Sequence, residues 1–249
     1  MKAAWPLLFL VGCGPTYIDA VGLAPTTLGS GLVAHWTFDQ TDGTVLEDDS
    51  GYRREGTISG ATFRNDGRFA GALHFNPGNS VTVETFPYAT PSVTSSWSFS
   101  AWVRMGDEDM AIDDFGTVIS TEVMQRGGWQ FQTRDCSPGI YWTFAYWIGP
   151  GLTYAHYECP CFELGRWSHA TVVVDATLHL LSFYVDGKLD KSVPLPAPIL
   201  AGSSTLFMGK WMEPGRLFSG SIDDVAIYHR ALLAREVEEL DMRPPPRPR

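Results

Sequence analysis

The sequence predicts an all-β protein in which two antiparallel sheets pack as a sandwich and one short helix lies near the C-terminus. Short runs of alternating apolar and polar residues recur along the chain, between turns rich in Gly, Asn, Asp and Pro. Helical periodicity is convincing only from Ala231 to Leu240. One large all-β domain commonly fills a span such as residues 31–242, and a hydrophobic content of 44% is ample for its core.

Each predicted strand is based on period-two alternation. Alternation of this kind marks residues 32–38, 69–75, 81–83, 97–103 and 167–174. The last segment ends in Thr171-Val172-Val173-Val174, whose β-branched side chains favour strands. A turn at Asn76-Pro77-Gly78-Asn79 separates two of the segments. The hairpin Leu180–Leu189 is the strongest local prediction, because Asp186-Gly187 suits a primed two-residue turn.

The predicted helix is amphipathic. Its apolar side is formed by Leu232, Leu233, Val237 and Leu240. Three glutamates are expected on a solvated face, Glu236, Glu238 and Glu239.

The N-terminus is predicted to be a targeting segment. An apolar run from Ala3 to Leu10 follows Lys2, and it is far shorter than the roughly 20 residues that span a bilayer. Leu10-Val11-Gly12-Cys13 resembles a bacterial lipobox, which implies that residues 1–12 are a signal peptide and that Cys13 is lipidated. The alternative is an ordinary secretory signal with an incidental cysteine. Either way we expect an exported protein, and the lipobox implies anchoring by lipid, in the periplasm or at the cell surface.

Two further segments are expected outside the domain. Residues 13–30 contain several glycines, prolines and threonines, which indicate a flexible tether. Residues 243–249 are rich in Pro and Arg and indicate an extended tail, since proline removes backbone donors.

The charge balance limits the partners. The formal net charge is −10 and no basic cluster is present, so nucleic acid is not an expected partner. Contact with a membrane is expected only through the lipid anchor.

Three cysteines remain after Cys13. In an oxidising compartment a disulfide is expected between Cys136 and either Cys159 or Cys161. A Cys159–Cys161 bridge is sterically poor. A zinc site formed by the three cysteines and His156 is a further alternative, although Cys-x-Cys is not a usual zinc spacing.

Several motifs, taken in order, resemble the laminin-G-like jelly-roll domains of the concanavalin A-like lectin/glucanase superfamily. They are Gly31-Leu32-Val33-Ala34-His35-Trp36-Thr37-Phe38-Asp39, Asp48-Asp49-Ser50-Gly51, Gly71-Ala72-Leu73-His74-Phe75, Phe99-Ser100-Ala101-Trp102-Val103, Trp167-Ser168-His169, Tyr184-Val185-Asp186-Gly187 and Ile222-Asp223-Asp224-Val225. The resemblance implies a jelly-roll sandwich, and a binding module rather than an enzyme. Residues 105–161 match least, and specificity is expected in such variable parts.

Calcium is the cofactor that the resemblance implies, at a structural site joining the first and last strands. We expect its ligands to be Asp39, Asp49 and Asp223, with carbonyl oxygens from the loop between Gly51 and Gly56, because calcium prefers oxygen ligands. Strand alternation puts Asp223 on the same packed side as Val225 and Ile227, where a carboxylate must be satisfied. The alternative needs no metal: Asp49 caps a turn and Asp223 accepts backbone amides.

A dense aromatic segment is the candidate ligand-binding region. By alternation Trp142, Phe144 and Tyr146 share one face of a strand, and Tyr141 and Trp147 lie on the other. One face must line the core, and the other is expected to offer rings to the apolar faces of sugars. We therefore expect Tyr141, Trp147 and Tyr157 to contact a glycan. The alternative is that all these rings simply fill the core.

No catalytic arrangement is expected. The Glu-x-Asp-x-Glu strand motif of glucanases in this superfamily is absent, and the acidic runs Asp107-Glu108-Asp109 and Asp113-Asp114 read as surface loops. The histidines have no motif context for nucleophilic catalysis. The expected function is non-catalytic carbohydrate binding. The alternatives are a protein-interaction or adhesion module, and a structural envelope lipoprotein.

Overall fold

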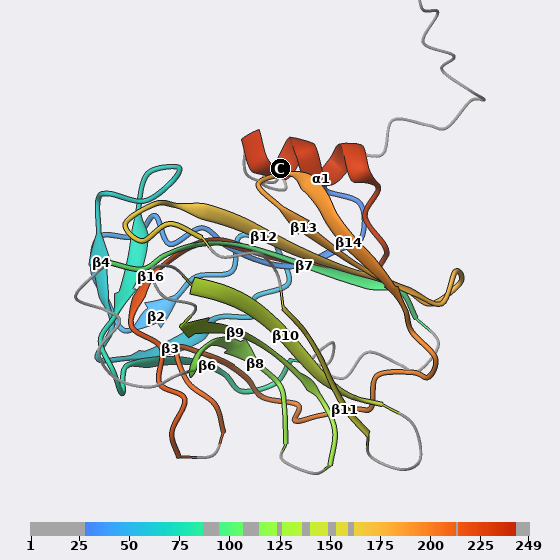
Figure 1. Ribbon diagram of the computed structural model, residues 1–249. Helices are drawn as coiled ribbons and strands as arrows, with labels where there is room; N and C mark the ends of the chain where they lie inside the picture. The colour runs from blue at the N-terminus through green and yellow to red at the C-terminus, as the bar shows by residue number, and fades with distance from the viewer. Residues whose placement is uncertain are drawn as a thin grey trace, which may run out of the picture.

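The structure is a computed structural model that describes residues 28–86, 95–106, 115–123, 126–135, 140–148, 153–158, 162–212 and 214–242. Within these ranges the chain forms two antiparallel β-sheets that face each other, and the helix α1 (Ala234–Met242) lies on the outer side of one of them (Figure 1). The predicted two-sheet sandwich with one short C-terminal helix is confirmed. No helix in the described ranges is long and apolar enough to cross a membrane.

The first sheet, called sheet A, has the order β14-β13-β12-β7-β16-β5-β4, and β1 also pairs with β16. The bounds of its strands are β1 Leu32–Trp36, β4 Thr62–Arg64, β5 Ala72–Phe75, β7 Trp97–Arg104, β12 Ser168–Asp175, β13 Leu180–Val185, β14 Lys188–Pro194 and β16 Gly220–Tyr228. The opening strand β1 therefore pairs directly with the closing strand β16.

The second sheet, called sheet B, has the order β11-β10-β9-β8-β15-β6-β3-β2. The bounds of its strands are β2 Val45–Leu46, β3 Gly56–Ser59, β6 Ser80–Val83, β8 Phe115–Ser120, β9 Trp129–Asp135, β10 Ile140–Ile148, β11 Thr153–Glu158 and β15 Leu206–Met208.

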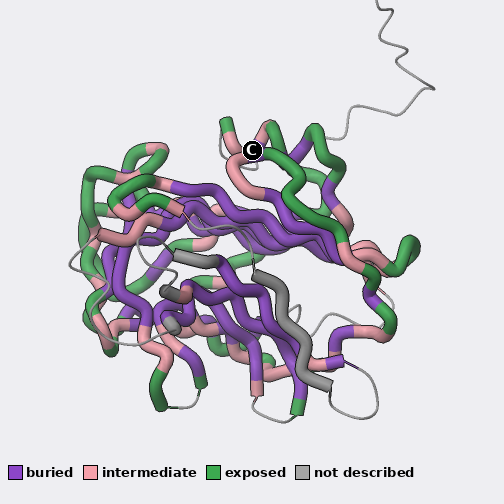
Figure 2. The backbone as a smooth tube through the Cα atoms, viewed as in Figure 1, coloured by how far each residue is buried: buried purple, intermediate pink, exposed green. Residues whose placement is uncertain are grey.

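The main core fills the space between the sheets, where Figure 2 shows the strands buried along most of their length. Aromatic rings dominate it: Trp97 stacks on Trp129 with 5.1 Å between ring centroids, and Phe131 lies 4.7 Å from Trp142. Offset and tilted ring pairs of this kind stabilise a core beyond the area that they bury.

Two local predictions are confirmed. The hairpin of β13 and β14 turns at Asp186 and Gly187, whose φ angles of 46° and 73° are those of a primed turn. The turn at residues 76–79 is closed by a hydrogen bond of 2.9 Å from the Asn79 amide to the Asn76 carbonyl. In contrast, the segment predicted as a strand from residue 69 becomes strand only at Ala72.

Helix α1 covers a second, smaller core on the outer face of sheet A. This core contains Leu28, Leu32, Val173, Tyr184, Ala226, Tyr228, Leu232, Val237 and Leu240. The helix begins later than predicted, and Leu233 is exposed.

The prediction that Glu236 lies on a solvated face is wrong. Its side chain is only 1% exposed, and its two carboxylate oxygens accept hydrogen bonds of 2.6 and 2.8 Å from the Arg230 guanidinium. One of these oxygens also accepts the Leu233 amide at 2.9 Å. Glu236 is buried because it satisfies a backbone donor at the start of α1 that has no partner within the helix.

A β-bulge in β16 decides where its two aspartates point. The register with β7 shifts between Asp223 and Ala226, and Asp224 has a φ of 46°. The extra residue reverses the alternation. Val225 and Ile227 therefore face the core between the sheets, while Asp223 lies on the outer side of sheet A. The prediction that Asp223 shares a side with Val225 and Ile227 is wrong for this reason.

Asp224, at the same bulge, bonds to the opening strand. Its Oδ1 lies 2.6 Å from the Nε2 atom of His35 in β1, and both residues are buried. Burial raises the pKa of Asp224, and the hydrogen bond with His35 opposes that rise. The buried His35–Asp224 pair thus links β1, near the start of the chain, to β16, near its end.

We expect the Asp224→Ala variant to lose about 3–5 kcal/mol of unfolding free energy in urea denaturation, because it leaves His35 buried without this partner. Asp224→Asn should lose less, since asparagine keeps an acceptor oxygen and tolerates a positive φ. The exposed Asp42→Ala control should change stability by no more than about 0.5 kcal/mol. Equal losses for Asp224→Ala and Asp42→Ala would contradict the importance of this pair.

Candidate functional site

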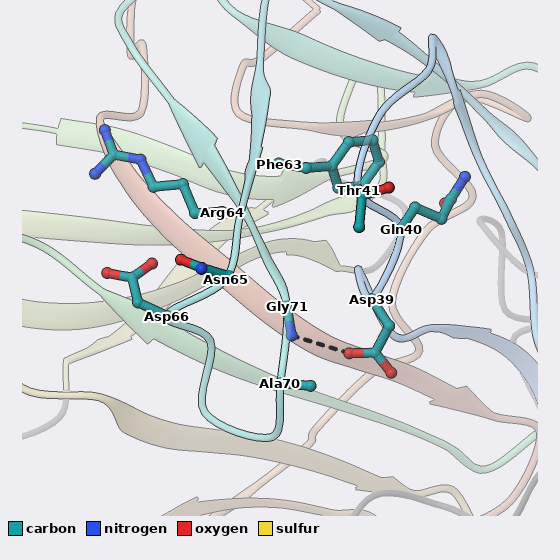
Figure 3. Close-up of a pocket in the computed structure, with 9 residues that line it drawn as sticks. All are labelled: Asp39, Gln40, Thr41, Phe63, Arg64, Asn65, Asp66, Ala70 and Gly71. Carbon is teal, nitrogen blue, oxygen red and sulfur yellow. Dashed lines mark hydrogen bonds between the residues drawn. The ribbon is translucent and has the colours of Figure 1, made fainter.

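A cleft with a volume of about 750 Å³ lies beside β4, at one edge of sheet A. Its lining comes from the segment after β1, from β4 and from the turn between β4 and β5: Asp39, Gln40, Thr41, Phe63, Arg64, Asn65, Asp66, Ala70 and Gly71 (Figure 3). Phe63 and Arg64 leave β4 in opposite directions: the Phe63 ring points toward Thr41 and Gln40, while Arg64 lies on the other side of the strand with Asn65 and Asp66.

A hydrogen bond joins the two walls of the cleft. The Gly71 amide donates to the Oδ1 atom of Asp39 at 3.0 Å, as the dashed line in Figure 3 marks. The walls also approach too closely for a side chain at Gly71, since a Cβ atom there would lie 2.3 Å from the Phe38 carbonyl oxygen. Glycine at this position lets the two backbone segments meet.

Asp223 holds the turn between β4 and β5 from inside the protein. Its Oδ2 atom accepts the amides of Arg68 and Phe69 at 2.7 and 3.1 Å. These bonds explain why residue 69, where a strand was predicted to begin, belongs to a turn instead. The pKa of Asp223 is raised to about 7, chiefly by burial. The charges of Asp224 and Asp39 also raise this pKa, while the hydrogen bonds from the two amides oppose the rise. The buried carboxylate of Asp223 thus supports one wall of the cleft.

The lining of the cleft contains planar polar groups and one aromatic ring. Amides of Gln40 and Asn65 both donate and accept hydrogen bonds, the carboxylates only accept, and the Arg64 guanidinium only donates. Arg104 donates a hydrogen bond to Asp66 and holds the pKa of that carboxyl below its usual range. This combination suits a small polyhydroxylated ligand with one apolar face.

The three residues predicted to bind calcium each accept a hydrogen bond from the protein. Asp49 accepts the Thr37 hydroxyl at 2.9 Å, while Asp39 and Asp223 accept the backbone amides described above. Asp39 and Asp223 interact electrostatically, but no three His, Cys, Asp or Glu side chains in the described ranges are grouped as metal ligands. Calcium binding stays a prediction. The alternative for Asp223, in which it accepts backbone amides, matches these contacts.

Sequence reasoning missed the role of Asp48, the neighbour of Asp49. The Asp48 carboxylate accepts the amides of His35, Ser50 and Arg54 at 3.0, 2.9 and 2.8 Å, and the Ser50 hydroxyl at 2.8 Å. An aspartate that begins a Gly-containing turn is the signal that could have revealed it, since such side chains bond to backbone amides a few residues on.

The aromatic segment in β10 mainly fills the core. Trp142, Phe144 and Tyr146 belong to the core between the sheets. Thr143 and Ala145, on the other face of the strand, are 3% and 0% exposed, so that face is not an open aromatic surface there. Trp147 is half-buried, and its indole N–H donates to the Oε1 atom of Glu122 at 2.8 Å.

The other two predicted glycan contacts are only partly placed. The side chains of Tyr141 and Tyr157 lie outside what the structure describes, although their backbones are in β10 and β11. The strand register pairs Tyr157 with Phe144 and pairs Trp147 with Tyr154. Glycan contact by Tyr141, Trp147 and Tyr157 stays a prediction.

Ser100, His169 and Asp241 are brought together under α1 in the order of a Ser-His-Asp arrangement. The Ser100 hydroxyl lies 2.7 Å from the His169 Nε2 atom, and the Nδ1 atom lies 3.6 Å from an Asp241 oxygen. However, Ser100 and His169 are both only 2% exposed, and the Trp102 ring stacks on the imidazole. Burial lowers the pKa of His169 to about 3, and the Arg68 charge adds to that effect. The arrangement packs the outer face of sheet A and offers no access to a substrate in this conformation.

The predicted lipidation site Cys13 and the cysteines Cys136, Cys159 and Cys161 lie outside the described residues. Lipidation and the pairing of Cys136 with Cys159 or Cys161 therefore stay predictions. The zinc alternative also lies outside, because its cysteines and the His156 side chain are not described.

The sandwich and its cleft define a jelly-roll domain of the lectin-like class. Residues 76–238 match the laminin-G family described as the concanavalin A-like lectin/glucanases superfamily, and the chain belongs to this family. No curated protein matches the chain in sequence.

Solved structures share the fold at low sequence identity. The binding domain of Paraclostridial Mosquitocidal Protein 1 aligns with a TM-score of 0.70 and 18% identity over 86% of this chain and 52% of that one. The botulinum neurotoxin serotype D binding domain aligns with a TM-score of 0.68 and 14% identity, over 87% of this chain and 52% of that one. The botulinum neurotoxin serotype D ligand binding domain in complex with N-acetylneuraminic acid aligns with a TM-score of 0.67 and 14% identity, over 86% of this chain and 51% of that one. The chain spans about half the length of these proteins, and the likeness shows the fold alone.

Asp223 should make stability depend on pH. Its pKa in the folded protein is about 7, above the ordinary value of 3.8, so its stabilising contribution is complete below about pH 4 and is lost as the pH rises through about 7. We expect Asp223→Asn, which cannot titrate, to lose less unfolding free energy over this interval than the unsubstituted chain. Urea denaturation at several pH values in chelator tests this, with Asp42→Asn as the control. Parallel pH profiles for the Asp223→Asn variant and the unsubstituted chain would show that Asp223 does not titrate in this way.

Proposed function

We propose that this domain is a non-catalytic carbohydrate-binding module and that the sugar binds in the cleft beside β4. The observation that carries the proposal is the lining itself, which combines planar polar groups of both hydrogen-bonding kinds with the Phe63 ring. Neighbouring sugar hydroxyls act together as donors and acceptors, and they match carboxylate, amide and guanidinium groups. An apolar sugar face would pack against the ring.

The cleft walls are held by hydrogen bonds within the protein, which favours ligand binding. Asp39 is bonded to Gly71, and Asp223 holds the amides of Arg68 and Phe69, so the walls are ordered before a ligand arrives. A site that is ordered in advance loses less conformational entropy on binding. The family supports a sugar ligand by its description, and one solved neighbour is a complex with N-acetylneuraminic acid.

We also propose that calcium stabilises the domain at Asp39, Asp49 and Asp223. Support comes from the interaction of the Asp39 and Asp223 charges, which a divalent cation would relieve. An ion that binds the folded chain in preference to the unfolded chain would raise the melting temperature. It would supply charge and structure here, and the ligand would still be held by the cleft.

A glycan array probed with the chain, once with calcium and once with chelator, tests the proposal. For the tightest-binding glycan we expect Arg64→Ala and Asn65→Ala each to weaken affinity about tenfold, the effect of losing one hydrogen bond to a charged or amide group. Thr62→Ala is the matched control, because Thr62 is exposed on β4 but does not line the cleft. Melting temperatures in the two buffers test calcium, which chelator should lower.

The contrary outcomes are distinct. Absence of binding to any glycan in either buffer would contradict the proposal and favour a protein partner. Binding that is lost in Trp147→Ala but kept in the two cleft variants would move the site to the β10 face. A melting temperature that is insensitive to chelator would contradict the calcium site.

We further propose that the protein is exported and anchored by lipid at Cys13. The support is the sequence alone, through the apolar run that ends in Leu10-Val11-Gly12-Cys13. Metabolic labelling with a fatty acid should mark the unsubstituted protein and should fail in Cys13→Ser, with Cys136→Ser as the control. Equal labelling of the unsubstituted protein and the Cys13→Ser variant would contradict lipidation at this residue.

A further inference from the structure

The cleft beside β4 is larger than one sugar unit requires. Its volume is about 750 Å³, within the range of roughly 300–1,000 Å³ in which proteins enclose drug-sized ligands. A single hexose is only about half the size of such a ligand, whereas a disaccharide is close to it. The volume therefore points to a ligand of at least two linked units.

One half of the cleft, called the ring half, is formed by Gln40, Thr41 and Phe63 (Figure 3). Phe63 is half-buried and packs against the core between the sheets, so the core fixes its ring. The Gln40 amide is fixed as well, because its Nε2 atom donates to the Val45 carbonyl and its Oε1 atom accepts the Glu47 amide, both at 2.9 Å. A fixed ring with polar groups beside it suits one sugar unit, whose apolar face packs on the ring.

The other half, called the polar half, is formed by Arg64, Asn65 and Asp66. All three residues are exposed. Arg104, at the end of the central strand β7, donates to the Asp66 Oδ2 atom at 2.6 Å, and the Trp167 indole N–H donates to the Asp66 carbonyl oxygen at 3.3 Å. The polar half is thus held by contacts separate from those that hold the ring half, and it binds hydroxyls by hydrogen bonds rather than by stacking.

Strand β4 separates the two halves. Phe63 and Arg64 are consecutive in this strand, and successive strand side chains point to opposite sides, as Figure 3 shows for these two. β4 is also the last strand in the order of sheet A, so no other described strand of the sheet covers its outer edge. Two linked sugar units can place one unit on each side of β4 and cross its edge at the linkage, whereas a single unit reaches only one half.

We propose that the cleft binds an oligosaccharide of at least two units, with one unit in the ring half and the next in the polar half. The inference rests on the proposed function, in which the sugar binds in this cleft. It adds the length of the ligand and gives the two halves separate roles. The ring half holds the first unit by stacking, and the polar half supplies hydrogen bonds that only a longer ligand reaches.

A cleft for a single sugar unit makes a different prediction. In that case every lining residue contacts the same unit, so each substitution weakens the binding of a monosaccharide and of a disaccharide by the same factor. In a cleft for two units, substitutions in the polar half weaken only ligands of two or more units. The ratio of the disaccharide affinity to the monosaccharide affinity, called the length ratio, is the measurement that separates the two cases.

Isothermal titration calorimetry on the full chain supplies the test. The probes are linear oligomers of glucose in α and in β linkage, of mannose and of N-acetylglucosamine, each from the methyl glycoside of the monosaccharide to the tetrasaccharide. For the series that binds most tightly we expect a length ratio of at least about ten, the effect of gaining one hydrogen bond to a charged group. A third and a fourth unit should each add less than about threefold, because they extend beyond a cleft of this volume.

Substitutions in each half test the assignment of roles. Asn65→Ala and Asp66→Ala should each reduce the length ratio at least about threefold and leave the affinity for the monosaccharide within about twofold. Phe63→Leu, which removes the flat ring, should weaken both ligands by a similar factor and keep the length ratio. Thr41→Ala makes the same prediction at an exposed residue of the ring half, in case Phe63→Leu fails to fold. Thermal melting of each variant identifies any loss of folding.

Thr62→Ala and Arg166→Gln are the matched controls. Thr62 is exposed on β4 but does not line the cleft. Arg166 forms an ion pair with Asp186 of the same length as the pair of Arg104 with Asp66, 2.6 Å, and it does not line the cleft either. Both variants should leave the affinities and the length ratio unchanged.

The outcomes separate this inference from the function on which it rests. If no probe of any length binds the unsubstituted chain, the proposed function fails and the inference fails with it. If sugars bind and Phe63→Leu weakens them, but a disaccharide binds no more tightly than its monosaccharide, the function stands and the inference is overturned. Equal weakening of the two ligands by Asn65→Ala and by Asp66→Ala would also overturn it, because both halves would then contact the same unit.

Discussion

The rest of the structure depends on the two buried carboxylates at the bulge in β16. Burying a carboxylate costs several kcal/mol unless donors satisfy it, and each of these two is satisfied by a distant part of the chain. Asp224 bonds to His35 in the opening strand, and Asp223 bonds to the amides of Arg68 and Phe69. One extra residue in a central strand therefore ties the first strand, the last strand and the turn beside β4 into one arrangement.

The same physical constraint recurs over the outer face of sheet A. Glu236 is buried because it pairs with Arg230 and accepts a free amide at the start of α1, and His169 is buried against Ser100 and the Trp102 ring. These bonds satisfy Glu236 and one nitrogen of His169, whereas the His169 Nδ1 and Tyr228 hydroxyl atoms are buried without a hydrogen bond among the described residues. The outer face of a sheet is solvated in a simple sandwich, but here it is a packed layer of mixed chemistry, and the cleft opens where that layer ends, at Asp66 and Gly71.

The family membership and the proposed function of this protein rest on different observations. The sandwich and the match over residues 76–238 place the chain in the concanavalin A-like superfamily, but such a fold carries many ligands. The case for a sugar comes from the cleft, where Asp39 and Asp66 accept, Arg64 donates and the Phe63 ring is apolar. Arg104 and Trp167, which belong to the centre of the sheet rather than to the cleft lining, hold Asp66 in place.

The sequence by itself determined the features that local rules control. Alternation defined the strand at residues 97–103, Asp186-Gly187 defined the hairpin, and Trp142, Phe144 and Tyr146 were assigned to one face, because side-chain direction in a strand follows a period of two. The structure alone decided that this face lies in the core, that a bulge reverses Asp223, and that Glu236 is buried. It alone brought Trp167 to Asp66, 101 positions apart in the chain. Such contacts depend on which strands become neighbours, and no local period of the sequence encodes that.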